Sequence, residues 1–117
     1  MKISYEDLLY LFEHDRDHVD ETRFYFDDDP EEDEHYIGYI PEVKGEIVDK
    51  PYWIGYCDID GGCEFKTATE LFEAKIFEGK SIKERWEHVI LLEIGGYDAD
   101  AESWHEKILS NRKRIDE

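Results

Sequence analysis

The first apolar pattern of the chain repeats with the period of an α-helix. Its apolar residues are Tyr5, Leu8, Leu9 and Phe12. They follow one another at i, i+3, i+4 and i+7, which places them on one face of a helix. Ser4 stands where its hydroxyl can cap the free N–H groups of the first turn. We therefore expect a helix that begins behind Ser4 and ends between Asp15 and His18.

Three short segments rich in β-branched and aromatic residues follow, and each predicts a strand. They are residues 22–26 (TRFYF), 35–41 (HYIGYIP) and 51–57 (PYWIGYC). The last two share Ile-Gly-Tyr, and as adjacent antiparallel strands they bring each glycine near an aromatic side chain that covers its backbone. We expect them to form a hairpin whose connection turns at Lys44-Gly45 and carries a strand extension at Ile47-Val48.

Two capping-box spacings predict short helices in the second half of the chain. Thr67 and Glu70 precede one apolar run, and Ser81 and Glu84 precede another. In this motif the first side chain and the third residue after it cap each other's backbone N–H groups. We expect one helix that ends near Lys75 and a second that contains Ile82, Trp86 and Val89.

The segment VILLEI, residues 89–94, is continuously apolar. Such a run is typical of a strand with both faces covered, so we expect it in the middle of the sheet. Asp98 or Asp100 can cap a last helix, in which basic residues gather at the C-terminal end that the helix dipole makes favourable for cations. The apolar stripe of that helix consists of Ala101, Trp104, Ile108 and Ile115.

The order of predicted elements is α-β-β-β-α-α-β-α. Hairpins, rather than repeated βαβ units, connect the strands, which is typical of the α+β class. We expect a mostly antiparallel sheet of about four strands with helices packed on one face. With 117 residues, the chain is expected to form a single domain over residues 1–117.

Acidic side chains dominate the charge of the chain. Its 32 acidic and 14 basic residues give a formal net charge of -18, and residues 1–35 hold 14 of the acids against three basic side chains. Residues 27–34 (DDDPEEDE) are seven acids and one proline, which predicts a solvated loop. Such a charge disfavours direct binding to nucleic acid or to an anionic membrane and favours a basic partner.

The N-terminal residues do not resemble a signal peptide. Glu6 and Asp7 stand where a signal peptide is apolar. The longest apolar run, residues 89–92, is far shorter than the roughly 20 residues of a membrane-spanning helix. We therefore expect a cytoplasmic protein whose cysteines are thiols.

The relation between Cys57 and Cys63 depends on the register of the hairpin between them. A two-residue turn at Asp60-Gly61 points the two sulfur atoms to opposite sides of the sheet. A loop of three residues, either 59–61 or 60–62, puts both on one face, where a disulfide comes within reach. The sequence favours packed thiols over a disulfide or a metal site.

Two pairs of residues have spacings that can bind a metal ion. His14 and His18 share a face if the first helix extends that far, which suits zinc, copper or nickel. Asp58 and Asp60 resemble the start of a calcium loop, but the residues that follow do not complete it. Helix-end chemistry for the histidines and turn chemistry for the aspartates are favoured over metal binding, so no metal and no cofactor is predicted.

No sequence pattern in the chain indicates catalysis. The patterns G-x-x-x-x-G-K-[ST], G-x-G-x-x-G, H-E-x-x-H and G-x-S-x-G are all missing. The histidines, serines and cysteines show no spacing that suggests a triad, although triads assemble in space. The sequence leaves the question of an enzyme open but favours a protein without catalytic residues.

Aromatic residues flank the acidic run on both sides. Exposed aromatic anchors beside dense charge are typical of protein interfaces, whereas aromatics in the core would leave the acids only a solubilising role. The predicted partner-binding residues are Tyr25, Asp27, Asp28, Asp29, Glu31, Glu32, Asp33, Glu34, Tyr36 and Tyr39.

The leading hypothesis is a small acidic cytoplasmic protein that engages a basic protein partner as an inhibitor, an immunity-type protein or a nucleic-acid mimic. The alternatives are a metal- or small-ligand-binding domain and a structural or interaction domain with no catalytic role.

Overall fold

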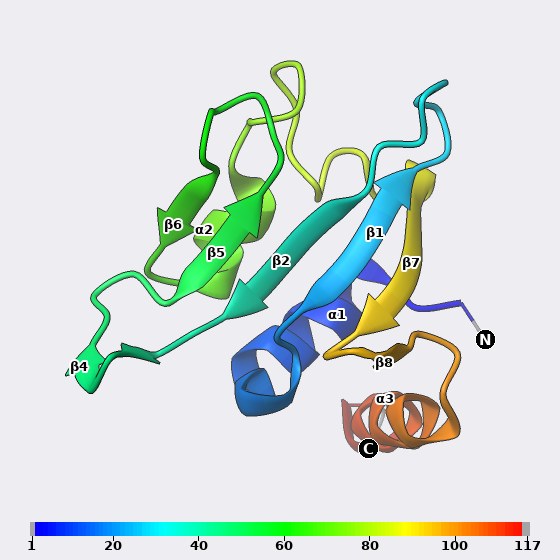
Figure 1. Ribbon diagram of the computed structural model, residues 1–117. Helices are drawn as coiled ribbons and strands as arrows, with labels where there is room; N and C mark the ends of the chain where they lie inside the picture. The colour runs from blue at the N-terminus through cyan, green and yellow to red at the C-terminus, as the bar shows by residue number, and fades with distance from the viewer. Residues whose placement is uncertain (1, 116–117) are drawn as a thin grey trace.

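A computed structural model describes residues 2–115 of the chain and contains one large antiparallel sheet (Figure 1). The order of its six strands is β6-β5-β2-β1-β7-β8, and a separate two-stranded ribbon joins β3 to β4. The elements are α1 (Tyr5–His14), η1 (Arg16–His18), β1 (Thr22–Phe26), β2 (His35–Tyr39), β3 (Glu42–Val43), β4 (Glu46–Ile47), β5 (Tyr52–Gly55), β6 (Cys63–Phe65), α2 (Ala68–Glu73), η2 (Trp86–His88), β7 (Val89–Ile94), β8 (Tyr97–Asp98) and α3 (Glu102–Ile115).

The predicted α+β class is confirmed, with more strands than expected. The main sheet has six strands instead of about four. Helices α1 and α2 lie behind the sheet in Figure 1, and α3 crosses its lower end beside β8. Within residues 2–115, no helix combines the length and the apolar character needed to cross a membrane.

Helix α1 forms as the sequence predicts. The Asp7 backbone N–H donates to Ser4 Oγ at 3.1 Å, and the Ser4 N–H donates to the Asp7 carboxylate at 2.8 Å, which completes a capping box. Burial alone would raise the pKa of Asp7, but hydrogen bonds from Arg112 and Ser4 lower it below its usual value. Since Arg112 belongs to α3, the start of α1 is bound to the last helix by a charged pair.

Side chains of the central strands alternate between two faces of the sheet. On the face toward α1 and α2, Phe24 and Phe26 are about 1% exposed and Ile37 is fully buried. On the other face, which we call the open face, Tyr25 and Tyr36 are only half-buried. This two-residue period is what one covered face requires.

The two Ile-Gly-Tyr segments pair as expected. Gly38 lies opposite Trp53, and Gly55 lies opposite Tyr36, so each glycine faces an aromatic residue across the ladder. The Gly38 position also receives the Asp20 carboxylate, which accepts hydrogen bonds from the Trp53 indole at 2.7 Å and from the Tyr39 N–H at 3.1 Å. Because Gly38 has no side chain, the Asp20 carboxylate and the Trp53 indole can meet over its backbone.

The expected helix after Ser81 does not form. Ser81 and Glu84 do make both hydrogen bonds of a capping box, at 3.0 and 3.1 Å. The chain then makes one turn and the short 3₁₀ helix η2, because Val89 is already paired with Phe26 in the sheet. Long-range strand pairing therefore overrides the local helix signal.

The expectation that VILLEI occupies the middle of the sheet is wrong. β7 lies between β1 and the two-residue edge strand β8, while β1 and β2 form the centre. Residues 89–93 are all half-buried. Both faces of β7 are partly covered, and this explains why its residues are continuously apolar although the strand is not central in the sheet.

The start and the end of α3 differ from the expectation. Trp104 and Ile108 are buried, but Ile115 is 73% exposed, and Asn111 occupies the buried position one turn earlier. The last turn of α3, which contains Ile115, therefore does not pack on the core. Asp98 accepts the Asp100 N–H at 2.8 Å, and within residues 2–115 neither carboxylate accepts an N–H of α3.

The connection between β2 and β5 is an exposed arm. Lys44 and Gly45 both have positive φ angles, 52° and 80°, which confirms the predicted turn there. The expected extension at Ile47-Val48 is instead strand β4, which pairs with β3 outside the main sheet. Ile47 is 90% exposed. We call residues 42–47 the arm.

The two glycines of the repeated segments predict different responses to alanine. A Cβ at Gly38 would lie 1.9 Å from Asp20 Oδ1 and 2.7 Å from Trp53 Nε1, whereas a Cβ at Gly55 has its nearest neighbour at 3.8 Å. We expect Gly38→Ala to lower the free energy of unfolding by about 1–3 kcal/mol through overpacking. Gly55→Ala is the matched control and should change it by less than about 0.5 kcal/mol.

Urea unfolding followed by circular dichroism measures both effects. Equal stability of the two variants would contradict the packing that the structure assigns to Gly38.

Candidate functional site

The acidic run forms the connection between β1 and β2. We call residues 27–34 the acidic loop. The Asp29 carboxylate accepts the N–H groups of Glu31 and Asp33, each at 3.1 Å, and the Asp27 N–H donates to the His88 carbonyl at 2.8 Å. These bonds hold the loop in a defined turn although its charges repel one another.

Three separate segments meet around an open pocket at this end of the sheet. They are the acidic loop, the start of the connection between β5 and β6, and the turn around Glu78. Figure 1 shows the acidic loop in cyan, the connection in green and the turn in yellow-green at the same end of the molecule. The pocket has a volume of about 500 Å³. Its carboxylates are Asp28, Asp29, Glu31, Asp33, Asp58 and Glu78, and we call it the acidic pocket.

Asp28 is the one of these six carboxylates that has basic side chains of the described residues beside it, namely Arg85 and, at 3.9 Å, His88. Arg85 donates to Asp28 at 2.6 Å, and its guanidinium carbon lies 3.7 Å from the centre of the Phe26 ring. Within residues 2–115, no Lys, Arg or His nitrogen lies within 4.0 Å of the other five carboxylates. The acidic pocket therefore carries a strong net negative charge.

A buried histidine lies at the floor of the acidic pocket. His35 is 7% exposed and packs against the rings of Phe24, Phe26 and Phe77, with centroid distances of 4.8 to 5.4 Å. Its Nδ1 lies 2.5 Å from the Tyr56 carbonyl oxygen. A carbonyl oxygen can only accept, so Nδ1 carries the hydrogen.

The other ring nitrogen of His35 is an acceptor. Burial lowers the pKa of His35, which keeps the ring neutral near pH 7. Because Nδ1 is protonated, Nε2 then holds a lone pair. Among the residues that the structure describes, Nε2 has no hydrogen-bond partner.

Tyr56 joins the two sides of the acidic pocket. Its ring stacks on His35 at 5.6 Å, and its hydroxyl donates to Asp33 at 3.1 Å. This hydrogen bond to Asp33 raises the pKa of Tyr56, so the hydroxyl remains a donor. The side chain is 60% exposed and leaves part of the aromatic ring open to solvent.

The acidic loop contributes only part of its predicted residues to the acidic pocket. Those that line it are Asp28, Asp29, Glu31 and Asp33. Asp27 bonds to His88 at 2.9 Å, Glu34 bonds to Arg23 at 2.6 Å, and Glu32 is exposed outside the pocket. Asp27, Asp28 and Glu34 are therefore paired with basic side chains, and within residues 2–115 the carboxylates from Asp29 to Asp33 are not.

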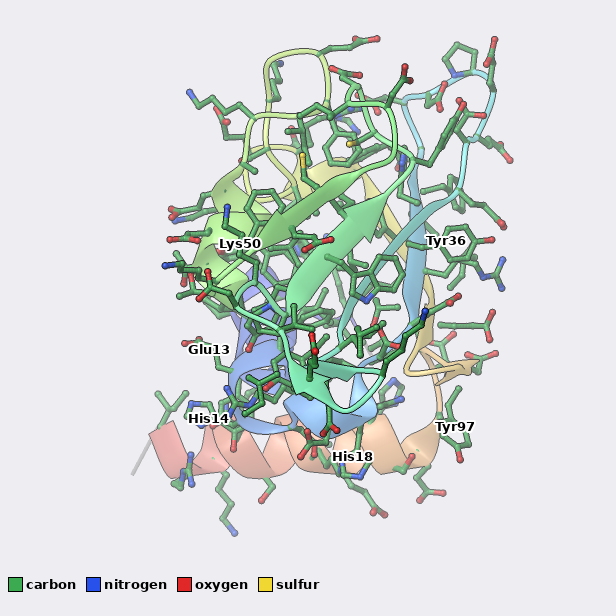
Figure 2. All side chains as sticks on the ribbon, turned by 60° about the vertical axis from the view of Figure 1, so that its left-hand side comes forward. Glu13, His14, His18, Tyr36, Lys50 and Tyr97 are labelled. Carbon is green, nitrogen blue, oxygen red and sulfur yellow. The ribbon has the colours of Figure 1, made fainter. Side chains whose placement is uncertain are left out.

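The three predicted tyrosines do not lie together. Tyr25 and Tyr36 lie on the open face, and Figure 2 shows Tyr36 on the side of the sheet away from α2. Tyr39 is only 8% exposed and packs against Tyr52 at 4.9 Å, so the expectation that it could serve as an exposed anchor is wrong. The alternation of β2 directs Tyr39 inward at the strand end far from the acidic loop.

Sequence reasoning missed the residues that complete the acidic pocket. His35 and Tyr56 come from β2 and from the chain after β5, Arg85 precedes η2, and Asp58 was considered only for calcium. One sequence signal did indicate that His35 is buried: it lies two residues before Ile37 in the same strand, so both side chains point to the same face of the sheet. The proximity of the other residues depends on how distant segments pack.

The cysteines fit neither predicted register. The ladder between β5 and β6 ends at Ile54 opposite Cys63, so the connection is longer than either predicted loop. The connection folds onto a neighbouring segment instead: the Asp58 N–H donates to the Ile76 carbonyl, and the Glu78 N–H donates to the Asp58 carboxylate. Cys57 and Cys63 are free, half-buried thiols, as expected, and burial raises the pKa of Cys63.

The histidine pair proposed for metal binding does not share a helix face. Helix α1 ends at His14, whose ring lies 4.7 Å from that of Tyr10, while His18 lies in η1 and bonds to Asp15 at 2.8 Å. Figure 2 shows the two histidines apart at the lower end of the molecule. The chelating geometry that the sequence left open for a longer helix therefore does not form.

One group within residues 2–115 brings three metal-ligating side chains together, namely Asp27, Asp28 and His88. The hydrogen bond to Asp27 raises the pKa of His88, which favours an ion pair over a metal ligand. Asp28 is already bonded to Arg85. These contacts satisfy the group without a metal ion.

The two histidines at this end of the sheet should titrate in opposite directions from the ordinary pKa of 6.5. We expect His35 to titrate below this value and His88 above it. Neutral His35 stabilises the folded state at pH 7, and this contribution is lost as the pH falls below 6.5, because the unfolded chain takes up the proton first.

Two-dimensional NMR of ¹⁵N-labelled histidines measures both pKa values and the tautomer. Assignment comes from the variants His35→Gln and His88→Gln. A protonated Nε2 in neutral His35, or a pKa of His35 above that of His88, would refute the geometry described here.

No protein-family model matches the chain, and no curated protein or solved structure matches it. What the acidic pocket can bind follows from the chemistry of its own side chains.

Proposed function

We propose that the chain is a small acidic binding protein of the cytoplasm and that its acidic pocket engages a basic protein partner. The observation that supports this function is the convergence of five unpaired carboxylates from three segments on one pocket. Like charges that line one pocket repel one another, and a bound cation reduces that repulsion. A negative pocket also accelerates the encounter with a positive partner.

The spacing of the carboxylates favours a chain of basic side chains over a metal ion. A metal ion requires several ligand atoms about 2.0–2.6 Å from one centre. Within residues 2–115, Asp27, Asp28 and His88 are the one group of three ligands within 4.8 Å of one another, and this group is already ion-paired. The remaining carboxylates of the acidic pocket are spread out, as suits several separate cations.

A partner that reaches around the acidic loop would also meet the open face, where Tyr25 and Tyr36 are half-buried. Aromatic side chains beside charged groups are frequent anchors of protein interfaces. Such a surface suits an inhibitor or immunity-type protein that covers the basic site of a toxin or a nuclease, in the place of nucleic acid. The free thiols Cys57 and Cys63 agree with a reducing cytoplasm.

Charge neutralisation in the acidic pocket tests this function. The triple variant Glu31→Gln, Asp33→Asn, Glu78→Gln removes three charges from the pocket, and Glu42→Gln, Glu46→Gln, Asp49→Asn removes three from the exposed region around the arm. We expect the pocket variant to bind basic nucleases and toxins at least about tenfold more weakly, and the matched control to bind within about threefold of the unmodified protein.

Isothermal titration at about 50 and 300 mM salt provides the measurement, and circular dichroism confirms that both variants fold. Affinity should fall as salt rises, because exposed charges are screened. Equal losses in the two triple variants, affinity indifferent to salt, or no binding to any basic protein would count against the proposal.

A further inference from the structure

The acidic pocket already holds one guanidinium group, which belongs to the chain itself. Arg85 lies over the Phe26 ring at 3.7 Å and bonds to the Asp28 carboxylate at 2.6 Å. Its side chain is only 16% exposed. An aromatic face beside a carboxylate is therefore an arrangement that binds arginine in this pocket.

A second pair in the acidic pocket has the same chemistry and lacks a cation. Tyr56 is 60% exposed, and its hydroxyl bonds to the Asp33 carboxylate at 3.1 Å, so the ring and the carboxylate lie side by side. Within residues 2–115, no Lys or Arg side chain lies over the Tyr56 ring or pairs with Asp33. This pair is free to bind a guanidinium from another molecule.

A further hydrogen-bond acceptor lines the acidic pocket beside its carboxylates. His35 is 7% exposed, and its Nε2 has no hydrogen-bond partner among the described residues. Nε2 is not one of the fully buried side-chain atoms that lack a partner, so it is accessible to solvent and can accept a hydrogen bond. The carboxylates and His35 Nε2 all accept hydrogen bonds. They therefore complement a ligand group that carries only hydrogen-bond donors.

Arginine fits these acceptors better than lysine. A guanidinium is planar and presents five N–H donors in a fixed fork, and it stacks on aromatic rings. A lysine ammonium is a compact, strongly hydrated charge that is best matched by acceptors converging on one point. The free carboxylates of the acidic pocket do not converge in that way.

We propose that the acidic pocket binds an arginine side chain of the partner, whose guanidinium lies against Tyr56 and bonds to Asp33. His35 Nε2 at the floor supplies a further acceptor. This inference rests on the proposed function and adds the identity of the recognised side chain.

Three labelled peptides of equal length test the choice of side chain. One contains repeated Gly-Arg-Ser, the second contains lysine in place of arginine, and the third contains citrulline, which keeps the shape of arginine without its charge. We expect the arginine peptide to bind at least about fivefold more tightly than the lysine peptide. The citrulline peptide should show no measurable binding.

Variants of Tyr56 link the preference to its ring. Tyr56→Leu should abolish the preference for arginine while lysine binding stays within about twofold, and Tyr56→Trp should increase arginine binding, since indole is the strongest cation–π partner. Tyr97→Leu is the matched control, because Tyr97 is 70% exposed and Figure 2 shows it at the lower end of the molecule, far from the acidic loop. This control should leave all three affinities unchanged.

The outcomes separate the two proposals. Equal affinity for arginine and lysine peptides, or a preference that survives Tyr56→Leu and is not increased by Tyr56→Trp, overturns the arginine inference but leaves the basic-partner function standing. Binding of neither cationic peptide, together with no binding to basic proteins, refutes the basic-partner function itself. Circular dichroism of each variant shows whether it folds, and the tryptophan variant provides an independent test if the leucine variant does not.

Discussion

Burial of Phe24 and Phe26 against the helix-covered side of the sheet is the constraint on which the rest of the structure depends. Each ring is about 1% exposed, and burying such a ring contributes roughly 1.5–3 kcal/mol. Phe24 lies opposite His35 in the ladder between β1 and β2. A slip of one residue would turn the tyrosines of the open face inward. The same packing that fixes this register therefore places His35 at the floor of the acidic pocket.

The acidic loop combines pinned ends with an unneutralised middle. Asp27 pairs with His88 and Glu34 with Arg23, and Asp29 accepts two backbone N–H groups of its own loop. These contacts order a segment whose net charge alone would favour an extended, mobile chain. The backbone that carries the carboxylates between the ends is thus held in a defined turn, and an ordered backbone would lower the entropic cost of binding a ligand there.

Local signals predicted the parts of the fold that depend on neighbouring residues, such as the capping box of α1 and the glycine–aromatic pairs of β2 and β5. Prediction from the sequence failed where contacts between distant segments determine the local structure. Pairing of Val89 with Phe26 ended the expected helix after Ser81, and docking of Asp58 on residues 76–78 replaced both predicted cysteine registers. The acidic loop could likewise be identified from the sequence, but its partners Tyr56 and Arg85 come from segments that only tertiary packing brings near.

The exposed arm lies at the opposite end of β2 from the acidic loop, and both residues of its Lys44-Gly45 turn are exposed. Foreign sequence is tolerated best at exposed loop tips of this kind. An affinity tag or a surface-attachment peptide inserted between these two residues would anchor the molecule with its acidic end pointing away from the support. Molecules attached in this way would all present the acidic pocket to the solution.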